Sequence, residues 1–395
     1  MRILIAAAGS RGDVAPYTGL GAALRQAGHE VALATTDAFA PLARAAGLGF
    51  RSLPSRPEPH GDVSDKRELM RAASAFVTEL GQGFAEVLAP DTDLLLLSAT
   101  TAPLGWQLAE ATGVRTAGAY VVPAHPTGDF PPVVMGERSL GRLGNRTAGR
   151  FALRMADRVY RQGVTDLRDR LGLPPLAPAA MRRRQEQANW PVLYGFSTAL
   201  VPRPADWRPG LDVVGTWEPY VAAGAALPTE LEDFLAAGPR PVFIGFGSMA
   251  GGVGERLSEI AVGALRRAGL RGVLQMDGPA GDDILTIGDV PHALLFPRLA
   301  AVVHHAGAGT TAAALRAAVP AVPVPVAADQ PFWAGRLAAL GAAAAPIPFA
   351  ALTEERLAEA LREVVRRQAY ARAVTEAAQH MATEDGVGAA VKALT

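Results

Sequence analysis

Two stretches of the chain share one order of features: an apolar strand-like run, a glycine-rich turn and a helix-like segment. One begins at residue 2 with RILIAAAGSRGDVAP, and the other begins at residue 241 with PVFIGFGSMAGG. Strand and helix signals alternate after each, and residues 93–100, DLLLLSAT, are typical of a parallel strand buried on both faces. This repeated β-α-β pattern predicts an α/β chain with two Rossmann-like doubly wound domains.

The length of the chain supports the same division. A chain of 395 residues exceeds what one core comfortably holds. Prolines cluster without periodicity between residues 202 and 240, which is typical of an interdomain linker. We expect an N-terminal domain over 1–205, a linker over 206–240, a C-terminal domain over 241–375, and a C-terminal helix over 376–395 that packs back on the N-terminal domain.

Composition excludes several classes of function. Lys+Arg and Asp+Glu both number 38, so no basic excess points to a nucleic-acid partner. The chain has no cysteine, which excludes disulfides, thiolate catalysis and cysteine-ligated metals. No stretch predicts an integral membrane segment or a secretory leader. We expect a cytoplasmic monomer or homodimer, and contact with a membrane through a local apolar face stays open.

The segment from residue 302 to Pro320 reads VVHHAGAGTTAAALRAAVP. It predicts a buried strand ending at the histidine pair, a small-residue loop, and a helix. A helix N-terminus stabilises an anion, and His305 stands at the mouth of this loop. His304 is the weaker candidate because neighbouring strand residues point to opposite faces. The candidate anion ligands are His305, Gly307, Gly309 and Thr310.

Ten residues later, Asp329 and Gln330 directly precede Pro331, which suits the first turn of another helix. A carboxylate beside an amide supplies the acceptors and the donor that sugar hydroxyls require. The alternative is that Asp329 only caps the helix, a contribution of about 0.5–2 kcal/mol. An anion site next to such a pair indicates a nucleotide-sugar site.

Two further motifs each allow two interpretations. Asp13 follows the first strand, as a helix cap or as a functional carboxylate. The run from Gly245 to Ala250 matches the dinucleotide pattern G-x-G-x-x-A, which makes an NAD(P)-dependent oxidoreductase the alternative function. That pattern requires an acidic residue about 20 positions on, and Gln275 is not acidic. Ser248 in this turn would instead bind one phosphate. No motif for a catalytic metal occurs, so none is expected.

The motifs together resemble the GT-B fold glycosyltransferases of the UDP-glycosyltransferase-like superfamily. In the family's order the chain contains G-S-R-G-D-V-x-P, F-G-S-M, P-H-x-x-x-F-P-R-x-A-A-V-V-H-H, A-G-A-G-T-T and D-Q-P-F-W-A. The bacterial natural-product and sterol glycosyltransferases are the most similar groups. The resemblance implies two domains that face each other across a cleft, the N-terminal one binding the acceptor and the C-terminal one the sugar donor.

The activity that the resemblance implies is inverting, metal-independent hexose transfer without a cofactor. The donor would be a UDP- or dTDP-sugar as co-substrate. The acceptor would be a hydrophobic small molecule, such as a polyketide or aromatic aglycone of bacterial secondary metabolism. A sterol or lipid glucosyltransferase and a non-catalytic partner protein remain alternatives.

The resemblance also assigns roles to residues of this chain. Asp13 falls on the general base. The donor contacts fall on Ser248, Val290, His292, His305, Gly307, Gly309, Thr310, Asp329 and Gln330. We expect the acceptor pocket to be lined by loops at 54–85 and 123–150, through Phe76, Phe84, Phe130 and Met135. The chain departs from the family at Ala306, where a glycine is common, and the extra methyl fits if its φ is negative.

Overall fold

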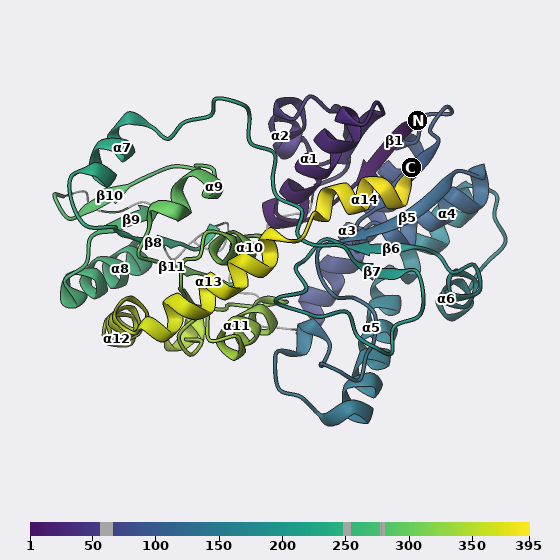
Figure 1. The fold of residues 1–395 in the computed structure, drawn as a ribbon. Coiled ribbons are helices and arrows are strands. Elements are labelled where there is room, and N and C mark those ends of the chain that lie inside the picture. Colours follow the sequence, from purple (N-terminus) through teal and green to yellow (C-terminus); the bar gives the residue numbers. More distant parts are fainter. Residues whose placement is uncertain (56–65, 248–253, 277, 279–280) are drawn as a thin grey trace.

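The computed structural model describes residues 1–55, 66–247, 254–276, 278 and 281–395. Within these residues, two parallel sheets form the two halves of the molecule (Figure 1). The N-terminal sheet has the strand order β3-β2-β1-β4-β5-β6-β7, and the C-terminal sheet has the order β10-β9-β8-β11-β12. Both orders are doubly wound, so the predicted fold class is confirmed.

The N-terminal half alternates strands and helices as its sequence pattern predicts. Its strands are β1 (Arg2–Ala6), β2 (Glu30–Thr35), β3 (Gly49–Ser52), β4 (Leu94–Leu97), β5 (Arg115–Tyr120), β6 (Val192–Tyr194) and β7 (Leu211–Val213). Its helices are α1 (Arg11–Gln26), α2 (Ala40–Ala45), α3 (Lys66–Val87), α4 (Ala102–Thr112), α5 (Gly141–Arg170) and α6 (Pro178–Gln187). Helices therefore cover both faces of the sheet.

Burial explains why the central strands are apolar throughout. Ile3 and Ile5 of β1 belong to the core on one face of the sheet, and Leu4 and Ala6 belong to the core on the other. All four side chains are buried. A strand covered on both faces needs apolar residues at every position rather than at alternate ones. Such a rigid, dry sheet holds the loops at its carboxyl edge in place.

The C-terminal half repeats the pattern on a smaller scale. Its strands are β8 (Val242–Gly245), β9 (Gly272–Gln275), β10 (Ile284–Thr286), β11 (Ala301–His304) and β12 (Ala321–Pro323). Its helices are α7 (Thr229–Ala236), α8 (Gly254–Ala268), α9 (His292–Leu295), α10 (Ala308–Arg316), α11 (Gln330–Ala339) and α12 (Glu354–Arg366). The central strands β8 and β11 pair so that His304 stands beside Gly245. Their carboxyl ends therefore lie next to each other.

The segment 206–240, expected as a linker, contains regular structure. Strand β7 pairs with β6, so the N-terminal sheet continues beyond residue 205. Helix α7 packs Leu231 and Leu235 into a core that also holds Phe243 of β8. The sequence pattern did not indicate β7 and α7, because each is a short periodic run between closely spaced prolines.

The C-terminal tail forms two helices, α13 (Gln368–Ala382) and α14 (Gly386–Leu394). In Figure 1 they run, in yellow, from the C-terminal half to the N-terminal half. Helix α14 lies against α1, with Ala390 and Leu394 in the same core as Tyr17. Thr353, the N-cap of the preceding helix α12, accepts a hydrogen bond from the main-chain nitrogen of Arg356. The tail thus connects the two halves.

Two segments expected as loops contain parts of long helices. Residues 66–85 belong to α3, and residues 141–150 begin α5. These two helices pack along each other, and an added Cβ at Gly163 of α5 would lie 2.9 Å from the main-chain oxygen of Val77. Interior positions of α3 were therefore mistaken for loop residues, because prolines and charges before residue 66 obscured its start.

Candidate active site

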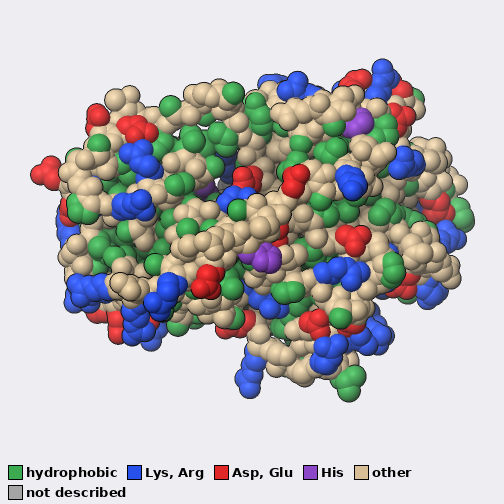
Figure 2. All heavy atoms as spheres, viewed as in Figure 1, with side chains coloured by type: hydrophobic (Ala, Val, Ile, Leu, Met, Phe, Trp, Pro, Cys, Tyr) green, Lys and Arg blue, Asp and Glu red, His purple; other side chains and the backbone are tan. Residues whose placement is uncertain are grey.

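Asp13 and His305 follow strands at the points where the strand order of each sheet reverses. The order reverses between β1 and β4 in the N-terminal sheet, and between β8 and β11 in the C-terminal sheet. Ligands of doubly wound folds bind outside the carboxyl ends of the strands at such points. Asp13 follows β1 and His305 follows β11. Figure 2 shows the surface hollowed between the two halves.

Asp13 lies in the first turn of α1 and is held by Ser10. The main-chain nitrogen and the hydroxyl of Ser10 both donate to Oδ2 of Asp13, each at 2.8 Å. An added Cβ at Gly9, whose φ is +145°, would lie 2.4 Å from the same oxygen. Asp13 therefore does cap the helix, as the structural interpretation expects. No hydrogen bond in the described part of the chain uses its Oδ1, so a capping role and a ligand role are compatible.

His305 lies between two glycine turns. An added Cβ at Gly307 would lie 2.6 Å from its Nε2, and one at Gly247 would lie 3.5 Å from its Cε1. Its buried Nδ1 has no hydrogen-bond partner among the described residues. Burial lowers the pKa of His305, so the imidazole is neutral near pH 7 and has an unused ring nitrogen. At Gly307 the ring leaves no room for a Cβ, whereas at Gly247 a Cβ would make an ordinary contact with it.

His304 has a different environment. Its side chain is fully buried, and its Nδ1 accepts a hydrogen bond from the main-chain nitrogen of Ala306 at 3.1 Å. Burial, with smaller contributions from His305 and His292, lowers the pKa of His304 to about 3. A neutral, enclosed imidazole of this kind supports the loop. Its burial leaves His305 as the stronger candidate for a ligand contact.

The loop after β11 differs from expectation at Ala306. Its φ is +64°, not negative, so a residue with a Cβ occupies the left-handed region. This conformation costs an alanine roughly 1–2 kcal/mol. Its methyl is fully buried in the core. The turn directs the next residues into α10, whose N-cap is Gly307.

The first turn of α10 supplies the expected anion donors. The helix starts at Ala308, so the main-chain N–H groups of Ala308, Gly309 and Thr310 precede the first helical hydrogen bond, which Thr311 donates to Gly307. His305 stands at the same end of the helix. A diphosphate here would meet main-chain donors, the positive end of a helix and an imidazole.

Asp329 and Gln330 begin α11 but do not cap it as the alternative expects. Asp329 occupies the N-cap position without a side-chain capping bond, and its Oδ2 accepts instead from Nε1 of Trp333 at 2.7 Å. The Oε1 of Gln330 accepts from the main-chain nitrogens of Val326 at 2.8 Å and Ala327 at 3.1 Å. Asp329 thus keeps an acceptor for a ligand, and Gln330 keeps its amide donors.

The two halves bring Asp13 and Asp329 near each other. Burial raises the pKa of Asp329, the hydrogen bond from Trp333 lowers it, and the nearby charge of Asp13 raises it again. An ion pair also links the halves, because Arg11 at the start of α1 contacts Asp289 at 2.7 Å. Both side chains of that pair are about half exposed, so it contributes at most about 1 kcal/mol.

Sequence reasoning missed Ser10, Arg11 and Trp333. Two of them carry a readable signal in their spacing. Ser10 and Asp13 have the three-residue spacing of a capping box, and Asp329 and Trp333 have the four-residue spacing of helix neighbours. The partner of Arg11 lies 278 positions away, and no local pattern indicates it.

Of the expected base-pocket residues, Val290 is buried and His292 is partly buried. The side chain of Val290 is buried in a core with Phe243, which leaves its main chain for a ligand. The ring of His292 stacks on Phe296 with centroids 4.3 Å apart, and burial lowers its pKa to about 4. Ser248 lies outside the described residues.

The expected acceptor residues do not form one surface. Phe76 and Phe84 are buried in the N-terminal core on α3, so they support the fold. Phe130 packs against Phe332 of α11 with ring centroids 5.4 Å apart, at the contact between the halves. Met135 is 53% exposed, in a short 3-10 turn, Val133–Met135, that contacts α11. Only the last two adjoin the helix that carries Gln330.

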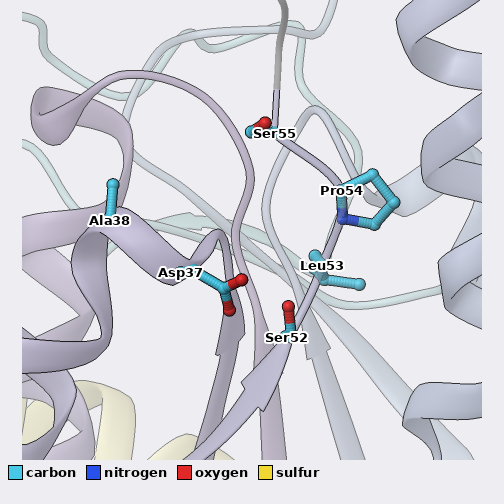
Figure 3. Close-up of a pocket in the computed structure, with 6 residues that line it drawn as sticks. All are labelled: Asp37, Ala38, Ser52, Leu53, Pro54 and Ser55. Atoms are coloured by element: carbon cyan, nitrogen blue, oxygen red, sulfur yellow. The ribbon is translucent and has the colours of Figure 1, made fainter.

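A separate pocket lies at the carboxyl ends of β2 and β3 (Figure 3). It is lined by Asp37, Ala38, Ser52, Leu53, Pro54 and Ser55. In Figure 3 the Asp37 carboxylate and the Ser52 hydroxyl face the same space. The pocket contains none of the expected site residues.

Known proteins share the fold or are similar in sequence over the whole chain. A solved structure of a spinosyn rhamnosyltransferase complexed with thymidine diphosphate matches all of this chain and all of that one, with a TM-score of 0.66 and 21% identity, which defines a GT-B fold. The O-mycaminosyltylonolide 6-deoxyallosyltransferase of Streptomyces fradiae is 37% identical over 98% of this chain and 95% of its own. A sterol 3-beta-glucosyltransferase of Arabidopsis thaliana is 32% identical over 100% of this chain and 65% of its own.

Family models agree with these similarities. Residues 3–89 match the N-terminal domain of glycosyltransferase family 28, and residues 274–394 match the C-terminal domain of erythromycin biosynthesis protein CIII-like proteins. The chain belongs to the GT-B glycosyltransferases of this type and is a glycosyltransferase enzyme. The chain is therefore neither an NAD(P)-dependent oxidoreductase nor a non-catalytic partner protein, the two alternative functions that the sequence left open.

Proposed function

We propose that this enzyme transfers a hexose from a UDP- or dTDP-sugar to a hydrophobic acceptor, a bacterial secondary metabolite such as a polyketide or aromatic aglycone. The observation that carries the proposal is the contact between the halves at this point: α1, which holds Asp13, packs against α10, and its Arg11 contacts Asp289 at 2.7 Å. The charge of Asp13 thereby reaches Asp329. A transfer site requires an acceptor-activating group and sugar-binding groups on opposite sides of the reacting bond.

The donor half is formed by α10 and α11. The N-terminus of α10 and the imidazole of His305 would bind the diphosphate. Asp329 and the amide of Gln330 would bind hydroxyls of the sugar, one accepting and the other donating. Val290 and His292, at the start of α9, would adjoin the base.

The acceptor half is formed by the loop after β1. The acceptor oxygen would attack the anomeric carbon from the side opposite the diphosphate, and the bond from that carbon to the diphosphate oxygen would break. The proton of the acceptor hydroxyl would pass to Oδ1 of Asp13, and the anomeric configuration would invert. The negative charge on the departing diphosphate would be stabilised by α10 and His305, so the proposal requires no metal.

The similarity to sterol glucosyltransferases supports a second acceptor class. The identity is 32% with the Arabidopsis sterol enzyme and 37% with the Streptomyces macrolide-type enzyme. The chain spans nearly all of the Streptomyces enzyme but 65% of the plant one. We therefore favour a natural-product aglycone over a sterol.

A thermal-shift screen with UDP, dTDP and their hexoses tests the donor assignment. A ligand that binds the folded protein and not the unfolded chain raises the melting temperature. At a ligand concentration one hundred times Kd, it stabilises the folded protein by about 2.7 kcal/mol. We expect one nucleotide series to raise it and the other to do so less. No shift with either series would contradict the proposed donor site. Sugar transfer to a sterol but not to polyketide or aromatic aglycones would favour the second class.

A further inference from the structure

The outer face of α5 carries an unusual set of exposed residues. These are Leu143, Thr147, Arg150, Phe151, Arg154 and Arg158. At about 100° per residue they form one stripe along the helix. Leu143 is 83% exposed and Phe151 is 57% exposed. Large apolar side chains this exposed, beside arginines on one stripe, indicate a surface that is covered in use.

The charge of this stripe is of one sign. Arg150, Arg154 and Arg158 stand four residues apart, so like charges are neighbours, which weakens a helix. None of the three pairs with a carboxylate within the described ranges, whereas the neighbouring Arg146 pairs with Asp206. The stripe contains no acidic residue, although the whole chain has net charge +0. The local charge is therefore available to an anionic partner.

The apolar character continues into the segment before α5. Val134 is 64% exposed, and Met135 and Leu140 are each 53% exposed. In Figure 1, α5 lies at the bottom of the molecule, and in Figure 2 that part projects as a lobe that carries Lys and Arg side chains beside Asp and Glu side chains. The surface is convex, so it offers no groove to a partner helix or strand.

We propose that the outer face of α5 and residues 134–140 dock on an anionic phospholipid surface. Guanidinium groups bind lipid phosphates, and apolar side chains between them enter the boundary between headgroups and acyl chains. A lipid bilayer can deform around the convex outer face of α5, whereas a folded protein would need a matching groove. No helix within the described residues is long and apolar enough to cross a membrane, so the enzyme would lie on the surface. The proposal does not depend on which donor or which acceptor the enzyme uses.

Co-sedimentation with vesicles tests the proposal. The full chain is mixed with vesicles of phosphatidylcholine alone or with 30% phosphatidylglycerol, at low and at physiological salt. We expect binding to the anionic vesicles only, weakening as salt rises. The triple variant R150Q/R154Q/R158Q should lose about fivefold in partitioning per arginine removed. The double variant Leu143→Ser with Phe151→Ser should weaken the part of vesicle binding that persists at high salt.

A matched variant separates this face from total charge. R256Q/R366Q/R372Q removes three exposed arginines of the C-terminal half that have no ion pair within the described residues, and it should bind as the wild type does. Circular dichroism melting shows whether each variant is folded. Equal loss in both triple variants, or no binding of the wild type to anionic vesicles, would overturn the proposal. Binding of an acidic protein with no vesicle binding would assign the face to a protein partner instead.

Discussion

Ser10 directs two hydrogen bonds at a single oxygen of Asp13. Its main-chain nitrogen and its hydroxyl each donate to Oδ2 at 2.8 Å. The carboxylate is thereby fixed at the start of α1, above Gly9. Oδ1 of Asp13 is left as the acceptor for a proton. Ser10 and Gly9 together set the direction of the Asp13 carboxylate.

Replacing Gly9 with alanine should displace that carboxylate. The added methyl would lie 2.4 Å from Oδ2, and a misplacement of about 1 Å can lower turnover by about a hundredfold. Steady-state kinetics should show kcat falling by at least about tenfold, while calorimetry shows unchanged nucleotide diphosphate affinity. Gly28→Ala is the control, because Gly28 also has a positive φ (+89°) but its added Cβ meets nothing within 4 Å. Equal kinetic loss in both variants would refute the positional argument.

Diphosphate binding should depend on His305. Removing a hydrogen bond to a charged group costs about 1.5–3 kcal/mol, so His305→Ala should raise the Kd of the nucleotide diphosphate by about tenfold or more. Gly307→Ala should have a similar effect with the imidazole still present, because its methyl would lie 2.6 Å from Nε2. Calorimetric titration measures both. An unchanged Kd in both variants would remove His305 from the donor site.

Trp333 should act through Asp329. Trp333→Phe removes the indole N–H that donates to Asp329 at 2.7 Å. We expect KM for the nucleotide sugar to rise by about fivefold to tenfold, as for one hydrogen bond, with no change in Kd for the bare diphosphate. Phe332→Leu trims a buried aromatic side chain at the next position and controls for core packing. A parallel rise in both constants would indicate a general structural effect.

His304 should make the fold sensitive to acid. Its pKa is about 3 in the folded protein and about 6.5 when unfolded, so below pH 6.5 the unfolded chain binds a proton that the folded chain does not. Stability should therefore fall as pH drops, by about 2–3 kcal/mol from this residue at pH 4.5. His304→Asn keeps an acceptor for the Ala306 nitrogen and should lose that much less between pH 7 and 4.5 in urea unfolding. Identical acid sensitivity would contradict the assignment.

The sequence predicts the fold better than it predicts the acceptor side. Continuous apolar strands and the glycine turns after them identify both sheets, because burial on two faces leaves a local signature. The order of the motifs also identifies the loops that carry Asp13, His305 and Asp329. Phe76 and Phe84 were misplaced because an aromatic residue looks the same in a loop and in the interior of a helix.

Contacts between distant segments were beyond sequence reasoning for a physical reason. The ion pair of Arg11 with Asp289 and the packing of Phe130 on Phe332 depend on how the two halves meet. The positive φ of Ala306 depends on tertiary constraint, since an isolated alanine avoids it. Only the folded chain fixes these features.

The central claim is that Asp13 takes the proton of the acceptor. The direct measurement is single-turnover sugar transfer by Asp13→Asn with saturating nucleotide sugar, alongside calorimetric donor affinity. Loss of a general base lowers the rate by about a hundredfold to ten-thousandfold, so we predict a fall in that range with donor Kd unchanged. Transfer by Asp13→Asn at nearly the wild-type rate would contradict the account.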